Sequence, residues 1–290
     1  MSLPRYIDLH SHTTESDGSY TPEELIDLAV QTDLQALAIT DHDTFSGYEM
    51  ALPFARKAGL DLVRGIELNS RLNLTNSDDS RAAHLLGLFP SREPSEEFIN
   101  WIEDQRSDRR ERNRKLAETL QERGVKVTLE EAEARGRNLT SRTHFAQILI
   151  EKGYVNSFDE AFREYLGEDA PSYVARQSLT SEEVIRRIRS GGGVSVVAHP
   201  VRLSLSRDAE RQELVKLKEA GLAALEIYHS DQDPQLQAYY HQLAQELDLL
   251  PTGGSDFHGR LKPDIDLGTG LRGNVRVPFE FLQRLREFAP

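Results

Sequence analysis

Short apolar runs recur along the 290-residue chain and alternate in several places with amphipathic stretches. Seven of the runs are rich in Leu and β-branched residues and have the length of buried strands. They cover residues 5–12, 35–41, 61–67, 82–89, 193–199, 222–229 and 248–254. Alternation of such strands with helices is typical of a parallel sheet, so we predict an α/β fold with a closed or open parallel sheet.

Helix-start signals mark two of the stretches between these strands. Thr21-Pro-Glu-Glu and Thr180-Ser-Glu-Glu each combine a capping hydroxyl with a glutamate three residues later, a pairing typical of a helix N-terminus. They predict helices over residues 22–31 and 181–189. Residues 207–220 and 233–247 also show helical periodicity.

Residues 92–178 show a different pattern, in which no segment resembles a strand. Residues 97–122 form one long, highly charged helical pattern that ends near Gly124, and shorter ones follow at 129–135, 141–152 and 157–165. We therefore predict a barrel domain formed by residues 1–91 and 179–290, with a helical insertion at 92–178. The insertion is expected to lie over the mouth of the barrel or beside it.

Histidines and carboxylates gather where the predicted strands end. Seven of the nine histidines lie at or just beyond a strand end, and acidic residues occupy similar places. The carboxyl ends of parallel barrel strands form the face that carries the active site, so these side chains are expected to converge and bind metal ions. The histidines are His10, His12, His42, His84, His199, His229 and His258, and the acidic residues include Asp17, Glu67 and Asp256.

Residue spacing and amino-acid composition limit which ligand atoms and which metal ions the site can have. His10 and His12 are two residues apart, as are Asp256 and His258, so each pair can point to the same side of a strand. Glu67 is a carboxylate that can bridge two ions. The chain has no cysteine, so the ligands are nitrogen and oxygen atoms, a set that suits Zn, Mn or Fe better than Ca or Mg.

Charge and hydropathy exclude several partners. The formal net charge is −13, so the overall field of the protein does not attract nucleic acid, and we expect no long duplex as a partner. No segment approaches the roughly 20 apolar residues of a membrane span. The first residues also lack the apolar stretch of a secretory signal. We expect a cytoplasmic enzyme without membrane contact, and the sequence leaves its oligomeric state open.

These motifs together resemble those of the PHP (polymerase and histidinol phosphatase) superfamily. They are Tyr6-Ile-Asp-Leu-His-Ser-His-Thr, Ser16-Asp-Gly, Ile39-Thr-Asp-His-Asp-Thr, Gly65-Ile-Glu, His84, Ala198-His-Pro and Gly254-Ser-Asp-Phe-His. The resemblance implies a distorted barrel of seven β/α units, in agreement with the seven predicted strands. The insertion, with Ser141-Arg-Thr-His-Phe-Ala, resembles the branch that contains nucleoside 3′,5′-bisphosphate phosphatases and 5′-to-3′ exonucleases of short RNA.

The resemblance also implies a cluster of three divalent ions, with manganese as the expected metal and zinc or iron as alternatives. Asp17 stands where many relatives have histidine, and its oxygen ligand suits manganese. The implied ligands are His10, His12, Glu67 and Asp256 for the first ion, Glu67, His84 and His199 for the second, and Asp17, His42 and His258 for the third.

The predicted activity is that of a metal-dependent phosphoesterase on small nucleotides or short 5′-phosphorylated RNA. A hydroxide held between two ions is the expected nucleophile, because coordination lowers the pKa of bound water from about 16 towards about 7. His229 and Arg202 are the candidate catalytic residues. His229 could be a metal ligand, a hydrogen-bond donor to phosphate or the acid that protonates the leaving oxygen, and the phosphate role is favoured. The candidate substrate-binding residues are Arg142, His144, Arg176, Arg202, His229 and Lys262.

Two alternative functions stay open at this point. Histidinol phosphate phosphatases use a similar cluster, and some polymerase-associated relatives keep a metal-binding module without catalysis. The helical insertion disfavours the first alternative, and the full ligand set disfavours the second. A basic run within the insertion is either a solvated helix face or a track for RNA; it consists of Arg106, Arg109, Arg110, Arg112, Arg114 and Lys115.

Overall fold

A sheet unit and a helical unit divide the chain. The computed structural model describes residues 6–136, 140–167, 169–174 and 179–289. The first unit comprises Met1–Ile99 and Ser178–Pro290, and the second comprises Asn100–Gln177. Each unit has its own cluster of buried apolar side chains.

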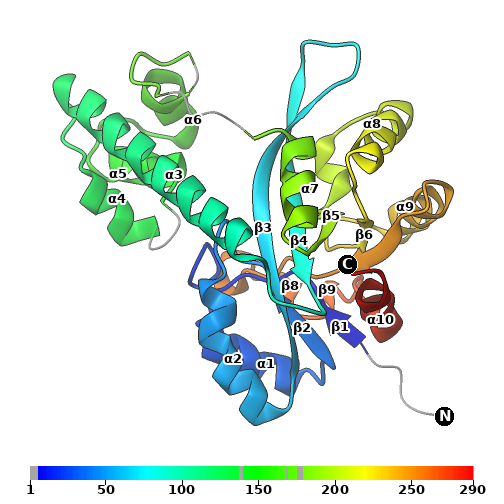
Figure 1. The fold of residues 1–290 in the computed structure, drawn as a ribbon. Coiled ribbons are helices and arrows are strands. Elements are labelled where there is room, and N and C mark those ends of the chain that lie inside the picture. The colour runs from blue at the N-terminus through cyan, green and yellow to red at the C-terminus, as the bar shows by residue number, and fades with distance from the viewer. Residues whose placement is uncertain (1–5, 137–139, 168, 175–178, 290) are drawn as a thin grey trace. The chain divides into compact units, whose positions relative to one another are not determined.

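The first unit is built on an eight-stranded sheet that is nearly closed into a barrel (Figure 1). Just beyond β1, the N–H of Leu9 donates to the carbonyl oxygen of Gly253, the last residue of β7, at 3.1 Å, so the two sides of the sheet meet. All seven predicted strands are confirmed, and β10 adds an eighth. In sheet order the strands are β10 (Val277–Pro278), β1 (Tyr6–Asp8), β2 (Ala36–Ile39), β3 (Asp61–Asn73), β4 (Ser80–Phe89), β5 (Val194–Val197), β6 (Ala224–Tyr228) and β7 (Leu250–Gly253).

The prediction of a parallel sheet is wrong for β4 and for β10. Strand β4 pairs antiparallel with both β3 and β5, and β10 pairs antiparallel with β1. The cause is the connection after β3: a short turn joins β3 directly to β4, where the N–H of Leu74 donates to the carbonyl oxygen of Asp79. A hairpin forces antiparallel pairing, whereas a parallel pair needs a longer crossover. A second short pair, β8 (Ile265–Asp266) and β9 (Gly270–Leu271), lies outside the main sheet.

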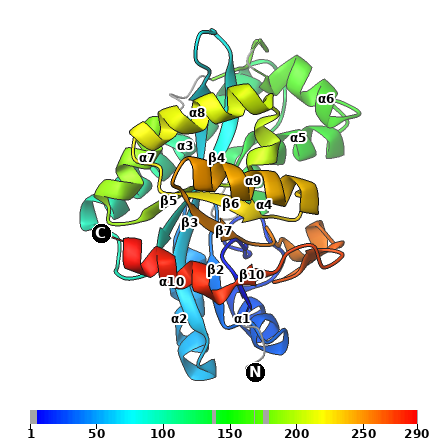
Figure 2. The same ribbon diagram turned by 90° about the vertical axis from the view of Figure 1, so that its right-hand side faces the viewer.

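Helices cover the outside of the sheet. The two predicted capping boxes are confirmed at Thr21 and Thr180, whose hydroxyl groups each accept the N–H of the glutamate three residues later. Figure 2 shows α7, α8, α9 and α10 crossing the outer face of the sheet near β5, β6 and β7. The helices of this unit are α1 (Pro22–Gln31), α2 (Ser46–Ala58), α7 (Ser181–Ser190), α8 (Arg207–Glu219), α9 (Pro234–Glu246) and α10 (Phe279–Phe288).

Strand β2 shows how the apolar core is arranged. Ala36 and Ala38 belong to a cluster shared with β1, β5 and α10, whereas Leu37 and Ile39 belong to a second cluster with α1 and α2. The alternation follows from the two-residue period of a strand. Burying each Leu or Ile side chain contributes about 1.5–3 kcal/mol relative to its exposed state. Both faces of this part of the sheet are therefore packed, which holds the strand ends in fixed positions.

The regular elements among the described residues of the second unit are all helices. Its core joins α3 to α4 and α5 through side chains such as Leu120, Ala132 and Phe145. Helix α3 ends near Gly124, as predicted, and Gly124 has a φ of +81° that favours glycine. The elements are α3 (Glu96–Glu122), which begins in the first unit, α4 (Leu129–Gly136), α5 (Arg142–Glu151), α6 (Phe158–Ala161) and a π-helical turn (Phe162–Leu166). Among the described helices, none is long and apolar enough to cross a bilayer.

Candidate metal centre

The end of β1 carries the first pair of predicted ligands. The Nε2 atoms of His10 and His12 lie 3.3 Å and 3.1 Å from Oε2 of Glu67. The same two nitrogen atoms lie 3.5 Å and 3.3 Å from Oδ1 of Asp256. All four residues are buried, and the ligand atoms of the group lie within 4.8 Å of one another.

Glu67 is the centre of the whole cluster. Its Oε1 lies 2.7 Å from Nδ1 of His84 and 3.1 Å from Nε2 of His199. Its Oε2 also lies 3.4 Å from Nδ1 of His42, and His42, Glu67 and His84 form a compact group of possible ligands. His199 is not part of that compact group. One carboxylate therefore contacts histidines from both sides of the cluster.

Glu67 and His84 lie inside strands, which corrects the prediction that the cluster residues stand at strand ends. Strand β3 continues to Asn73, six residues past Glu67, and His84 is the fifth residue of β4. In the antiparallel register, His84 pairs with Asn69, two residues from Glu67. The long hairpin thus places two ligand-type side chains side by side without a strand end at either position.

A third group forms around Asp17, on the loop after β1. One carboxylate oxygen of Asp17 lies 3.5 Å from Nδ1 of His12 and 3.4 Å from Nε2 of His258, and the other lies 3.6 Å from Nε2 of His42. The Asp17 side chain is 42% exposed, so this end of the cluster is open to solvent. The predicted third set of ligands is thereby brought together, with His12 beside it.

Buried carboxylates around the cluster hold its backbone. Asp41 accepts the N–H and the hydroxyl of Thr13 at 2.7 Å each and the hydroxyl of Ser16 at 2.6 Å, which fixes the loop that carries Asp17. Asp8 accepts the backbone N–H of His10 and of Ser255, on the two sides of the barrel seam. Neither carboxylate could be assigned a role from the sequence.

Electrostatics keeps the central carboxylates ionised. Burial raises the pKa of Glu67, but the nearby histidines His42, His84 and His10 outweigh it and hold the pKa well below its usual range. Burial likewise opposes ionisation of Asp17, yet His258 and the neighbouring histidines lower its pKa. Burial lowers the pKa of His42 to about 4, so its ring is neutral at pH 7. Burial lowers the pKa of His10 and His12, but the surrounding carboxylates outweigh it and raise both, that of His12 to about 10. Ionised carboxylates and neutral imidazoles are the forms that bind metal ions, so a bound ion would take the place of these protons.

The donor set fits divalent metal ions. Nε2 of His12 and Nδ1 of His42 are buried and have no hydrogen-bond partner among the described residues, although both face carboxylate oxygens. Buried polar atoms without partners are costly, and positive charge placed between these nitrogens and the carboxylates would satisfy both. Nitrogen and carboxylate ligands are typical of Mn, Zn and Fe sites.

Three donor groups converge on the second oxygen of Asp256. Lys262 Nζ lies 2.8 Å and an Arg202 guanidinium nitrogen lies 3.1 Å from Oδ2, while His229 Nε2 lies 3.4 Å away. The ring of His229 is oriented by Asp231, whose backbone N–H donates to Nδ1 at 3.0 Å. Nε2 of His229 therefore carries the proton and acts as a donor towards the cluster.

The other predicted substrate-binding residues lie in the second unit or outside the described residues. Arg142 donates to the carbonyl oxygen of Leu166 at 3.0 Å and lies over the rings of Phe162 and Tyr173. Nδ1 of His144 accepts the backbone N–H of Ser141 at 3.0 Å, so this histidine helps to cap α5. Arg176 lies outside the described residues.

The basic run on α3 is largely paired within the second unit. Arg110 Nε lies 2.7 Å from a carboxylate oxygen of Glu133, and Arg114 pairs with Glu111 and Glu118. Arg106 pairs with Glu103 and Lys115 with Glu111 in the same way. These contacts favour the interpretation of a solvated helix face over that of an RNA track.

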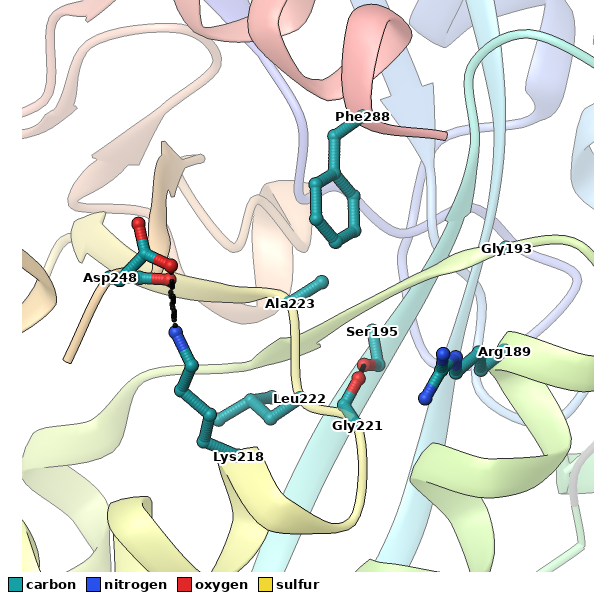
Figure 3. Close-up of a pocket in the computed structure, with 9 residues that line it drawn as sticks. All are labelled: Arg189, Gly193, Ser195, Lys218, Gly221, Leu222, Ala223, Asp248 and Phe288. Carbon is teal, nitrogen blue, oxygen red and sulfur yellow. Dashed lines mark hydrogen bonds and ion pairs between the residues drawn. The ribbon is translucent and has the colours of Figure 1, made fainter. Parts of the chain in front are cut away.

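A separate pocket lies at the amino ends of β5 and β6 (Figure 3), whereas His199 and His229 follow the carboxyl ends of the same strands. Its lining includes Arg189, Ser195 and Phe288, and the amine of Lys218 donates to Asp248 at 3.1 Å. None of the predicted site residues lines this pocket.

The fold and the cluster define a class of metal-dependent phosphoesterases, and sequence comparison identifies the family. The profile of the PHP domain matches residues 8–174. The chain belongs to the PHP family, and it is a hydrolase of phosphate esters. The predicted family and enzyme class are thereby confirmed.

Relatives of established function span nearly the whole chain. The 5′-3′ exoribonuclease Rnm of Escherichia coli is 34% identical over 269 residues, which are 91% of this chain and 88% of that protein. The 3′,5′-nucleoside bisphosphate phosphatase of Chromobacterium violaceum is 31% identical over 90% of each chain. A phosphoribosyl 1,2-cyclic phosphate 1,2-diphosphodiesterase of Eggerthella lenta is 30% identical over 87% of this chain and 94% of its own length.

Solved structures show the same fold. A protein of Bifidobacterium adolescentis, provisionally assigned as a metal-dependent phosphoesterase, matches with a TM-score of 0.73 and 29% identity over 98% of this chain and 96% of its own. A Chromobacterium violaceum protein described as an amidohydrolase, with bound sulfate and no metal, matches with a TM-score of 0.72 and 29% identity over 97% and 96%.

Proposed function

We propose that this enzyme hydrolyses phosphate esters of small nucleotides, such as nucleoside 3′,5′-bisphosphates, or of short 5′-phosphorylated RNA, with the aid of three divalent ions. The observation that carries the proposal is the arrangement of eight ligand-type side chains around Glu67, with a cationic corner beside them. Relatives that act on these two kinds of substrate match about nine-tenths of the chain.

The compact ligand groups, together with the separate contact between His199 and Glu67, support an assignment of residues to ions. His10, His12, Glu67 and Asp256 would hold the first ion, and Glu67, His84 and His199 the second. Asp17, His42 and His258 would hold the third. When bound, divalent ions neutralise phosphate oxygens and lower the pKa of water at the site. The mixture of nitrogen and oxygen ligands is consistent with manganese, and also with zinc or iron.

The donors around Asp256 are suited to hold the phosphate. Arg202 and Lys262 supply positive charge next to the first ligand group, where phosphate oxygens would replace part of their contact with Asp256. The Nε2–H of His229 points to the same place, so it can donate a hydrogen bond to phosphate or a proton to the leaving oxygen. A donor at Nε2 makes His229 unsuited to be a metal ligand.

We also propose that residues 92–178 act as a substrate cap. The second unit has its own core, so it can present residues to substrate without being part of the barrel. Arg142, close to the N-terminus of α5, and His144 remain the candidates for contact, together with Arg176. For Arg142 and His144, contact with substrate would come in addition to the contacts that they make within the second unit.

Turnover of a small set of substrates tests the proposal. Purified enzyme with Mn²⁺ should release phosphate from 3′-phosphoadenosine 5′-phosphate or mononucleotides from a short 5′-phosphorylated RNA, and faster than it releases phosphate from histidinol phosphate. A higher kcat/KM for histidinol phosphate would overturn the substrate class. Absence of hydrolysis of both nucleotide substrates by ion-loaded enzyme would overturn it as well.

A further inference from the structure

Glu226 is a buried carboxylate that contacts two predicted ligands without belonging to any ligand group. It lies on β6, and its side chain is fully buried. Its Oε1 lies 2.9 Å from Nδ1 of His10, and its Oε2 accepts the backbone N–H of His199 at 2.5 Å. Among the described residues, the three compact groups of possible ligands do not include it.

The contact with His10 decides which ring nitrogen faces the cluster. An ionised carboxylate can only accept hydrogen bonds, so Nδ1 of His10 carries the proton. The opposite nitrogen, Nε2, then points to Oε2 of Glu67 at 3.3 Å and to Oδ1 of Asp256 at 3.5 Å. Glu226 thus fixes both the rotation of the ring and the tautomer that leaves Nε2 available to a metal ion.

The contact with His199 acts on the backbone. His199 has a φ of 30° and a ψ of 61°, a left-handed conformation that is unfavourable for a residue with a side chain. The hydrogen bond to Glu226 holds the peptide N–H in this conformation. With the backbone so placed, Nε2 of His199 reaches Oε1 of Glu67 at 3.1 Å.

We propose that Glu226 is a positioning residue that sets two metal ligands at once, the imidazole of His10 and the backbone of His199. The proposal rests on the proposed function, because it assumes that these histidines bind ions. It also requires both carboxylate oxygens of Glu226 to act as acceptors. The side-chain amide introduced by Glu226→Gln has one acceptor and one donor group, so it can satisfy only one of the two N–H groups.

Three variants distinguish a positioning role of Glu226 from the effects of burying a glutamate and of its negative charge. Glu226→Gln keeps the size and loses one acceptor, whereas Glu226→Asp keeps the charge and both acceptors but is one methylene shorter. Glu210→Gln is the matched control: Glu210 is also a buried glutamate of the first unit, and it bonds to Tyr240 and to no cluster residue. Circular dichroism and melting of each variant establish that it is folded.

Zinc affinity, measured by competition with a chromophoric chelator, is the first measurement. Loss of a residue that orients a ligand typically weakens metal binding by about 10–100-fold. We expect a loss of this size in both Glu226→Gln and Glu226→Asp, and wild-type affinity in Glu210→Gln. If Glu226→Asp bound zinc as tightly as the wild type while Glu226→Gln bound it more weakly, the negative charge of residue 226 alone would account for the effect. That result would overturn the positioning role of Glu226. Wild-type affinity in both Glu226 variants would overturn it too.

Hydrogen exchange of the His199 amide in ion-free protein is the second measurement, and it does not depend on metal binding. The amide should be protected in the wild type and in Glu210→Gln. In Glu226→Gln, either this protection should be lost or the nitrogen NMR shift of His10 Nδ1 in zinc-loaded protein should change, because the amide side chain can satisfy only one of the two N–H groups. Unchanged protection in Glu226→Gln, together with an unchanged nitrogen NMR shift of His10 Nδ1 in zinc-loaded protein, would overturn the proposal. Failure of the wild type to bind zinc would overturn the proposed function instead, while the amide measurement would still test the contact with His199.

Discussion

At the scale of single residues, the cluster depends on carboxylates that serve several histidines. Glu67 contacts five of them through its two oxygens, which no other described carboxylate does. The ligand types and the His-x-His and Asp-x-His spacings were sufficient to predict which residues meet. Glu226, Asp8 and Asp41 could not be assigned from the sequence, because their role follows from backbone N–H groups and ring nitrogens whose directions only the fold defines.

Substitution Glu67→Gln should remove more than one ion. The amide offers one acceptor oxygen in place of two, and it lacks the negative charge that holds the surrounding histidines. We expect a lower ion content by elemental analysis and a fall in kcat/KM of about 100-fold or more. The buried control Glu210→Gln should keep both values. A Glu67→Gln enzyme with full ion content would show that Glu67 is not a shared ligand.

Substitution His229→Asn should affect proton donation and leave the ions in place. The Nε2–H of His229 faces the cluster, and its Nδ1 is occupied by Asp231. Removal of a general acid typically costs about 10²–10⁴-fold in rate. The loss of kcat should be large for a nucleotide and much smaller for p-nitrophenyl phosphate, whose leaving group needs no proton. Equal losses for the two substrates would argue for phosphate binding alone, and a loss of ions would make His229 a ligand.

Glu210 makes a prediction about stability and pH. Burial raises the pKa of this carboxyl above 4.5, although the hydroxyl of Tyr240 donates to it. A raised folded pKa contributes stability that is fully present below the unfolded pKa and is lost as the pH rises through the folded pKa. The Glu210→Gln variant has no such loss, so its Tm should rise relative to wild type as the pH increases from about 4.5 to about 8. A Tm difference that stays constant or falls over this range would be inconsistent with a raised pKa.

At the scale of elements, the long β3–β4 hairpin was the main departure from the predicted fold. The turn-forming residues of positions 72–81 indicated a loop or a hairpin, and a hairpin is what forms, whereas strand-and-helix alternation alone predicted a parallel partner for β3. Helix α2 was also not among the predicted helices, because its N-cap residue Phe45 has no side-chain capping bond and Pro53 interrupts its pattern. Strands β1 to β7, being short apolar runs, were all predictable, whereas the two-residue strands β8, β9 and β10 were not.

Helix α2 begins close to the loop that carries Asp17, and Gly47 is the residue that permits this approach. A Cβ atom at Gly47 would lie 1.9 Å from Oδ2 of Asp41 and 2.7 Å from the hydroxyl oxygen of Thr13. Glycine to alanine in a helix normally stabilises by about 0.8–1 kcal/mol. Here we expect Gly47→Ala to destabilise by about 1–3 kcal/mol through overpacking, and to weaken ion binding because Asp41 must move. Denaturant unfolding and zinc titration measure the two effects, and a stabilised variant would contradict the contact.

At the scale of the whole molecule, the acidic chain must bind an anionic substrate. The net charge of −13 repels phosphate at long range, so the attraction has to be local, from the ions and from Arg202 and Lys262. The helical unit has its own core and supplies the residues through which substrate choice is proposed to act. Its fold could be predicted from the helical patterns, whereas the pairing of its basic run with acidic side chains from α3 and α4 could not.

The ion content of active enzyme tests the central claim most directly. A chelator removes the ions from the purified protein, which is then reloaded with Mn²⁺. Hydrolysis of 3′-phosphoadenosine 5′-phosphate should return in proportion to the Mn²⁺ bound, and elemental analysis should find up to three ions per chain. Activity that is complete in chelator-treated protein, with fewer than one ion per chain, would contradict the account.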